Sequence, residues 1–169
     1  IQVLEGTEKK TQEQVFENLR CGAAKLLGEI RFHEIKKISV VHIDGSFDAV
    51  LAFAEGLALA NYQFIKYFFD KEKKKSSLEE IWLVIPLAPE KMITQLNNLI
   101  EAVCLSRDLV NEPLSFLNAE QLASEIENMG KSAGFKVEVL TRKKIESLKM
   151  GGLLAVNRGS IDPPTFSIL

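Results

Sequence analysis

The feature that most constrains the fold of this 169-residue chain is its alternation of strand-like and helix-like segments. Residues 38–43 (ISVVHI) and 81–85 (IWLVI) are continuous apolar runs rich in β-branched residues, a composition typical of buried parallel strands. A helix-like segment, residues 47–62, lies between them. Strands and helices that alternate in this way predict an α/β fold with a mostly parallel sheet.

Capping residues mark the start of two predicted helices. Thr11 with Gln14 has the spacing of a capping box, and Asn118 with Gln121 has the same form. The predicted helices cover residues 11–30, 47–62, 89–109, 118–133 and 141–148. The predicted strands cover residues 1–4, 38–43, 81–85, 135–139, 153–156 and 165–169, and residues 71–77 and 157–164 are expected to form loops. The chain starts and stops in strand-like sequence, so we expect it to be an excised portion of a longer protein.

Composition and charge exclude several classes of protein. The formal net charge is −2, so no long-range field favours nucleic acid or an anionic membrane. No apolar run approaches the roughly 20 residues that span a bilayer, and this sequence shows no signal-peptide pattern of a basic start, an apolar stretch and a cleavage site. The two cysteines, Cys21 and Cys104, lack metal-ligand spacing and fit a reducing compartment. We expect both to pack as small apolar groups in a soluble, cytoplasmic protein.

Few residues suggest chemistry directly. The sequence has no H-E-x-x-H, G-x-S-x-G or P-loop pattern and no Cys/His cluster. His42 and Asp44 resemble a base with its orienting carboxylate, but no nucleophile accompanies them, so we interpret them as polar groups at a strand end. Residues 151–160 (GGLLAVNRGS) resemble a phosphate loop, but no helix follows Ser160, so a structural turn is favoured. Arg158 is expected to hold a carbonyl or a carboxylate of the protein.

Two charged features have structural interpretations. Residues 71–75 (KEKKK) lack interleaved aromatic residues, so we interpret them as a solvated loop and not as a nucleic-acid or lipid site. Glu55 is the single charge deep in an otherwise apolar helix, where an unpaired carboxylate is costly. We expect a structural partner for it, either a backbone amide or a basic side chain.

A series of short segments resembles the leucyl aminopeptidase (cytosol aminopeptidase) family. Residues 107–113 (RDLVNEP) resemble the R-D-L-V-N-x-P signature that opens the family's catalytic domain. In order and at consistent spacing follow residues 118–123 (NAEQLA), 137–140 (VEVL), 145–156 (IESLKMGGLLAV) and 157–164 (NRGSIDPP). Residues 55–64 (EGLALANYQF) are similar to the E-G-x-x-L-x-x-Y-x-F of the amino-terminal domain. Departures at Asn118-Ala119, Lys149 and Asn157 fall at cap and loop positions and do not imply altered chemistry.

The resemblance implies a domain layout. Residues 1–88 are expected to be part of an amino-terminal macro-like α/β domain that helps to assemble a homo-hexamer. Residues 89–106 would form a connector helix, and residues 107–169 the first layer of an α/β catalytic domain. In the family, the ligands of two divalent ions (Mn²⁺, Zn²⁺ or Mg²⁺) and the arginine at the catalytic bicarbonate come later. We therefore assign no catalytic, cofactor-binding or metal-binding residue to this chain.

The resemblance also implies an activity for the parent protein. Members hydrolyse amino-terminal residues from peptides with two close metal ions, which polarise the scissile carbonyl and activate a water. Two alternatives remain open, a non-catalytic macro-like binding module and a DNA-binding or regulatory role. The first half of the chain lacks a Gly-rich phosphate loop, and the acidic balance does not favour DNA. Substrate preference and metal identity do not follow from these residues.

Overall fold

A computed structural model describes residues 11–41, 46–84 and 90–169 of the chain. These residues form two compact units, Ile1–Asp108 and Leu109–Leu169. Helices and short strands occur in both, so the predicted α/β class is confirmed. Among the described residues, no helix is both long enough and apolar enough to cross a lipid bilayer.

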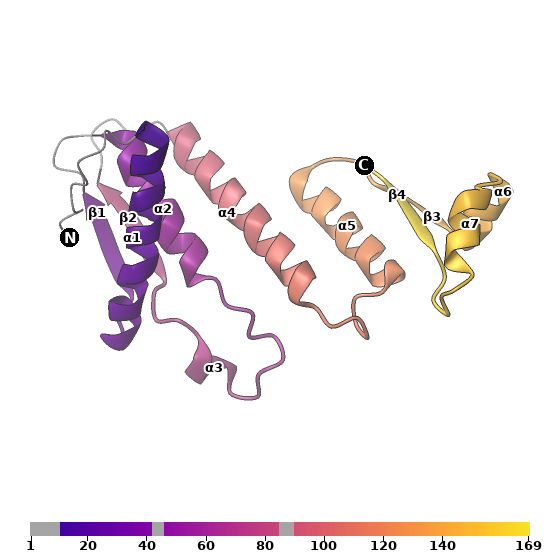
Figure 1. The fold of residues 1–169 in the computed structure, drawn as a ribbon, viewed down its shortest axis with the longest axis horizontal. Helices are drawn as coiled ribbons and strands as arrows, with labels where there is room; N and C mark the ends of the chain where they lie inside the picture. Colours follow the sequence, from indigo (N-terminus) through magenta and orange to yellow (C-terminus); the bar gives the residue numbers. More distant parts are fainter. Residues whose placement is uncertain (1–10, 42–45, 85–89) are drawn as a thin grey trace. The chain divides into compact units, whose positions relative to one another are not determined.

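The first unit contains a two-stranded parallel sheet and its helices (Figure 1). The elements are α1 (Gln12–Phe32), β1 (Lys37–Val41), α2 (Phe47–Asn61), α3 (Lys71–Lys74), β2 (Glu80–Val84) and α4 (Glu90–Asn111). Strands β1 and β2 pair in parallel, with Ile38 opposite Ile81, as the sequence predicts. The core lies where α1 and α2 meet each other and one face of this sheet. Its buried residues are Ala23, Leu27, Ile30, Leu57 and Leu78.

Helices α1 and α2 begin at side-chain caps. The Gln14 backbone amide donates to the Thr11 hydroxyl over 3.3 Å, and the Thr11 amide donates to Gln14 Oε1 over 2.9 Å. This is the predicted capping box. Helix α2 starts at Ser46 and buries residues on several sides, as its nearly uniform apolar character predicts.

The sheet of the first unit has one covered and one exposed face. Ile38 and Ile81 pack against the core, whereas Val41, Trp82 and Val84 are more than half exposed. The prediction that residues 38–43 form a buried parallel strand is therefore correct in the pairing, but burial holds for only one face of the part that the structure describes. Since a strand alternates its side chains, helices on one face leave every second residue uncovered.

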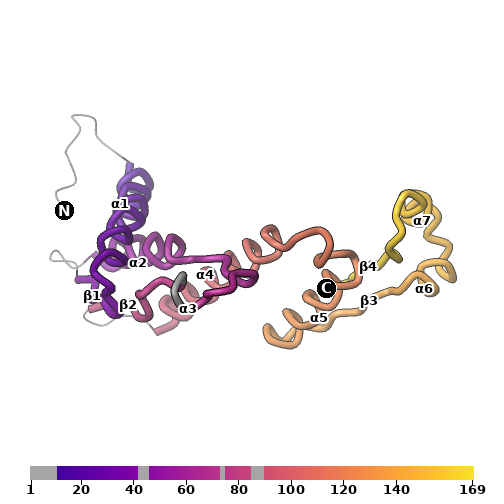
Figure 2. Tube along the Cα trace, turned by 90° about the horizontal axis from the view of Figure 1, so that it is seen from below, coloured from indigo at the N-terminus to yellow at the C-terminus, as the bar shows by residue number. Residues whose placement is uncertain are grey.

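The second unit contains α5 (Ala119–Ala133), β3 (Glu138–Thr141), α6 (Arg142–Ser147), α7 (Gly151–Asn157) and β4 (Thr165–Ile168). Asn118 caps α5 by accepting from the Gln121 amide over 2.9 Å. Gly134 ends it in the left-handed conformation, with a φ of 80°, which suits glycine. Figure 2 shows α5 and the α6–α7 pair on opposite sides of the two strands within this unit.

Three sequence-based expectations about single elements are wrong. Residues 153–156 form most of the helix α7 and not a strand, because a short apolar run does not distinguish the two. Strands β3 and β4 pair antiparallel, so the expected mostly parallel arrangement holds only in the first unit. Residues 71–74, expected to be loop, form the single-turn helix α3.

Candidate functional site

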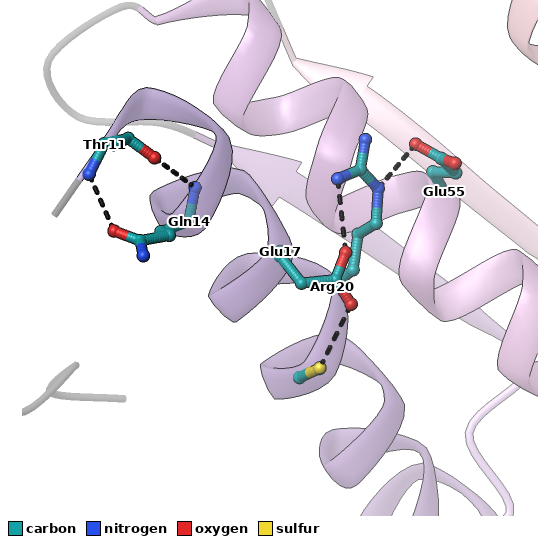
Figure 3. A network of polar contacts seen from close by, with 6 residues as sticks. Thr11, Gln14, Glu17, Arg20 and Glu55 are labelled. Carbon is teal, nitrogen blue, oxygen red and sulfur yellow. Dashed lines mark hydrogen bonds and ion pairs between the residues drawn. The ribbon is translucent and has the colours of Figure 1, made fainter.

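A network of polar contacts joins α1 to α2 (Figure 3). Arg20 Nε donates to Glu55 Oε2 over 2.8 Å, and the same guanidinium lies 3.5 Å from Glu17 Oε2 through Nη1. The Glu55 side chain retains only 20% of its exposed area, and that of Arg20 retains 34%. Glu55 therefore has a basic partner, one of the two kinds that the sequence predicts. The hydrogen-bonded ion pair offsets the free-energy cost of partly burying the carboxylate.

The ion pair borders an open hollow between α1, α2 and α4. This space measures about 320 Å³, and most of its lining is apolar. Asp48 and Gln95 add polar groups to the charged pair. Because Arg20 and Glu55 bind each other, both charges are already satisfied without a ligand.

A second hollow lies between β1, α1 and α2. It measures about 420 Å³ and is lined by aliphatic side chains and Phe53, with Ser39 as its one polar lining residue. Among the described residues, Ser39 is thus the single side chain of this lining with a polar group for a ligand. The macro-like nucleotide-binding alternative therefore gains no support from this hollow.

A third cluster joins the end of α4 to the end of α2. The Tyr62 hydroxyl donates to Asp108 Oδ1 over 2.7 Å, and Arg107 Nη1 donates to the Leu59 carbonyl oxygen over 2.6 Å. The Arg107 guanidinium also lies over the Tyr62 ring, 5.4 Å from its centroid. Sequence reasoning did not identify this cluster, although Tyr62, Arg107 and Asp108 all stand in quoted motifs. The two motifs could have pointed to these residues as important. The sequence does not show, however, that the two motifs contact each other in the fold.

The remaining sequence candidates do not converge on one site. His42 and Asp44 lie outside the described residues. Lys71 and Lys75 are exposed, as expected of a solvated segment. Arg158 is exposed and follows α7. Asn157 Nδ2 donates to the Asp162 carbonyl oxygen over 3.0 Å. This hydrogen bond within the loop before β4 agrees with the predicted structural turn.

The two cysteines occupy different surroundings. Cys21 is exposed on α1, and its thiol lies 3.5 Å from Glu17 Oε1, so the expectation that it packs as an apolar group is wrong. Cys104 is partly buried, and burial is the main reason why its thiol pKa is raised.

Metal ligands require several donors in one place. Within residues 11–41, 46–84 and 90–169, no group of three or more His, Cys, Asp or Glu side chains is placed to hold an ion.

The sequence matches proteins described as probable cytosol aminopeptidases along nearly its whole length. The family described as "Cytosol aminopeptidase family, catalytic domain" matches residues 104–169. A probable cytosol aminopeptidase of Clostridium perfringens is 35% identical over 181 residues, which cover 99% of this chain and 36% of the relative. The chain belongs to the cytosol aminopeptidase family. It spans about a third of the length of the curated family members that it matches.

Solved structures show the same fold. The bottromycin maturation enzyme BotP in complex with Mn is 27% identical and superposes with a TM-score of 0.73, covering 90% of this chain and 32% of BotP. A mutant of tomato leucine aminopeptidase superposes with a TM-score of 0.76 over 96% of this chain and 34% of its own. At 23% identity this second likeness shows the fold alone. The family resemblance drawn from the quoted motifs is confirmed by the family match and by the identity to the Clostridium perfringens relative.

Proposed function

We propose that the protein containing this chain is a two-metal aminopeptidase that removes amino-terminal residues from peptides. In this proposal the chain supplies the end of an amino-terminal domain (1–88), a connector helix (89–106) and the start of the catalytic domain (107–169). The observation that carries the proposal is the 35% identity to a probable cytosol aminopeptidase over 99% of the chain.

The metal dependence rests on a relative and not on the described residues. BotP, which is similar to this chain, has been solved in complex with Mn. Because the described residues contain no cluster of potential metal ligands, we assign Mn²⁺, Zn²⁺ or Mg²⁺ to other parts of the protein. The described side chains are then scaffold: they build helices and sheets that support a centre formed elsewhere.

Assembly and location are part of the same proposal. The complete protein would act as a homo-hexamer in the cytoplasm, on peptide substrates, without a membrane or nucleic-acid partner. The charge balance supports the last point, because a net charge of −2 gives no general attraction to a phosphate backbone.

The first prediction separates the chain from the complete protein. With leucine p-nitroanilide and Mn²⁺, the complete protein is expected to release p-nitroaniline and to lose this activity in EDTA. The 169-residue chain is expected to give no release above the buffer rate and no tight Mn²⁺ binding by calorimetry. Substantial turnover by the chain alone would overturn the scaffold assignment, and a complete protein inactive with Mn²⁺, Zn²⁺ and Mg²⁺ would overturn the proposed function.

A further inference from the structure

Helix α4 is weakly packed for its length. It runs over 22 residues, Glu90–Asn111, and none of them is buried. Among the described helices and strands, none approaches α4 closely along its backbone. Met92, Leu96 and Leu99 instead face the open hollow of about 320 Å³ between α4, α1 and α2. With no buried residue to anchor this helix, its polar contacts carry more weight in holding it in place.

The cluster of Tyr62, Arg107 and Asp108, hereafter the clamp, reaches across from α4 to the end of α2. Leu59 lies in the last turn of α2, where carbonyl oxygens lack a donor within the helix. Arg107 Nη1 supplies that donor over 2.6 Å and places a cation at the negative end of the α2 dipole.

Asp108 and Arg107 hold Tyr62 at two different points. The Asp108 carboxylate accepts from the hydroxyl over 2.7 Å, and the guanidinium lies 5.4 Å from the ring centroid. Hydrogen bonds to ionised groups are stronger than neutral ones, and a cation over an aromatic face adds attraction. All three side chains are partly buried, which reduces the screening of these contacts by water.

We propose that Arg107 and Asp108 are positioning residues that fasten the C-terminal turn of α4 to the end of α2. Both residues lie in the region that matches the family's catalytic domain, which starts at residue 104. The clamp therefore gives the first residues of the catalytic-domain segment a fixed attachment on the preceding helix pair. The attachment itself follows from the contacts, whereas its value for catalysis rests on the proposed peptidase function.

The test measures how freely α4 moves relative to α1. Cys21 is exposed on α1 and takes one spin label, and Glu101→Cys, at an exposed position of α4, takes the second, with Cys104→Ser removing the remaining thiol. Pulsed electron–electron double resonance then gives the distribution of distances between the two labels, measured in the 169-residue chain diluted with unlabelled chain so that only distances within one molecule contribute. A fastened helix gives one narrow distribution, and a helix freed from the clamp gives a broad one.

Two clamp variants and one control are compared. Tyr62→Phe keeps the ring and removes only the hydroxyl, and Asp108→Asn removes the charge. The control is Ser106→Ala, because the Ser106 hydroxyl donates only within its own helix, to the Ala102 carbonyl over 2.9 Å. We expect both clamp variants to broaden the distribution while far-UV circular dichroism stays unchanged, and the control to leave it narrow. Equal distributions in Tyr62→Phe, Asp108→Asn and Ser106→Ala would overturn the proposal.

A second readout keeps the clamp distinct from the proposed function. In the complete protein, Tyr62→Phe is expected to lower kcat with leucine p-nitroanilide more than Ser106→Ala does, at equal melting temperature. If the complete protein has no peptidase activity but the label distances still respond to Tyr62→Phe, the clamp holds and the proposed function fails. If activity is present and the distances do not respond, the clamp is wrong and the function stands.

Discussion

Glu55 and Gly56, two consecutive residues of α2, both act on the same residue of α1. Glu55 binds the Arg20 side chain, and Gly56 lies against the Arg20 backbone. A Cβ added to Gly56 would stand 2.5 Å from the Arg20 carbonyl oxygen and 2.8 Å from its carbonyl carbon. The E-G pair of the family motif thus has a structural explanation: one residue holds the two helices together, and the other lets them approach.

Gly56 is in close contact with α1 and Gly22 is not, so alanine at these two positions should change the free energy of unfolding in opposite directions. Gly56→Ala forces α1 and α2 apart, so we expect a loss of about 1–3 kcal/mol in the free energy of unfolding, as for overpacked cores. Gly22→Ala lies within α1 with no atom within 4 Å of the added Cβ, so the higher helix propensity of alanine should stabilise by about 0.5–1 kcal/mol. Urea unfolding followed by circular dichroism measures both, and equal effects of the two variants would contradict the helix contact.

The Arg20–Glu55 pair predicts a coupling larger than that of an exposed pair. Arg20→Ala, Glu55→Gln and the double variant form a double-mutant cycle in urea unfolding, with an expected coupling of about 1–2 kcal/mol for a half-buried charged hydrogen bond. The control cycle is Arg142 with Glu146, an exposed i, i+4 pair at 3.1 Å, for which about 0.3–0.5 kcal/mol is expected. A coupling at Arg20–Glu55 no larger than the control would contradict the expectation that partial burial strengthens this pair.

At the scale of elements, the sequence predicts helix boundaries best where residues close together in the chain determine them. Thr11 with Gln14 and Asn118 with Gln121 place the starts of α1 and α5 correctly, because a cap is made by residues that are neighbours in the chain. Residues 153–156 were misassigned because four apolar residues fit a strand or a helical turn equally well. The sequence predicts that Glu55 has a partner such as a basic side chain, but it does not say which one. Arg20 is 35 positions away, and only the packing of two helices brings it close.

Two helix starts in the second unit differ in their caps and predict different costs. Asn118 accepts from the Gln121 amide at the start of α5, so Asn118→Ala should lower the free energy of unfolding by about 1 kcal/mol. Thr141 precedes α6 but makes no capping hydrogen bond, so Thr141→Ala should change it by less than about 0.5 kcal/mol. The two melting curves under the same conditions make the comparison, and a cost at Thr141 equal to that at Asn118 would refute it.

At the scale of the whole chain, the described sheets are small and incompletely covered. Each contains two strands, and each described strand pairs along one edge only. The outer face of the β1–β2 sheet carries Val41, Trp82 and Val84, all more than half exposed. A two-stranded sheet is marginal by itself, and an exposed apolar strand edge invites pairing with another copy.

These features predict that the 169-residue chain associates with itself as its concentration rises, because association covers the apolar face and completes the open edges. Val84→Lys places a charge on that face of β2 and should shift the sedimentation profile toward monomer. The matched control is Val156→Lys. Val156 is 85% exposed, and it belongs to α7 of the second unit and not to the β1–β2 sheet. Analytical ultracentrifugation over a range of concentrations distinguishes the outcomes. A monodisperse, cooperatively melting monomer at every concentration would contradict the argument, and equal shifts from both lysines would assign the association to net charge and not to this face.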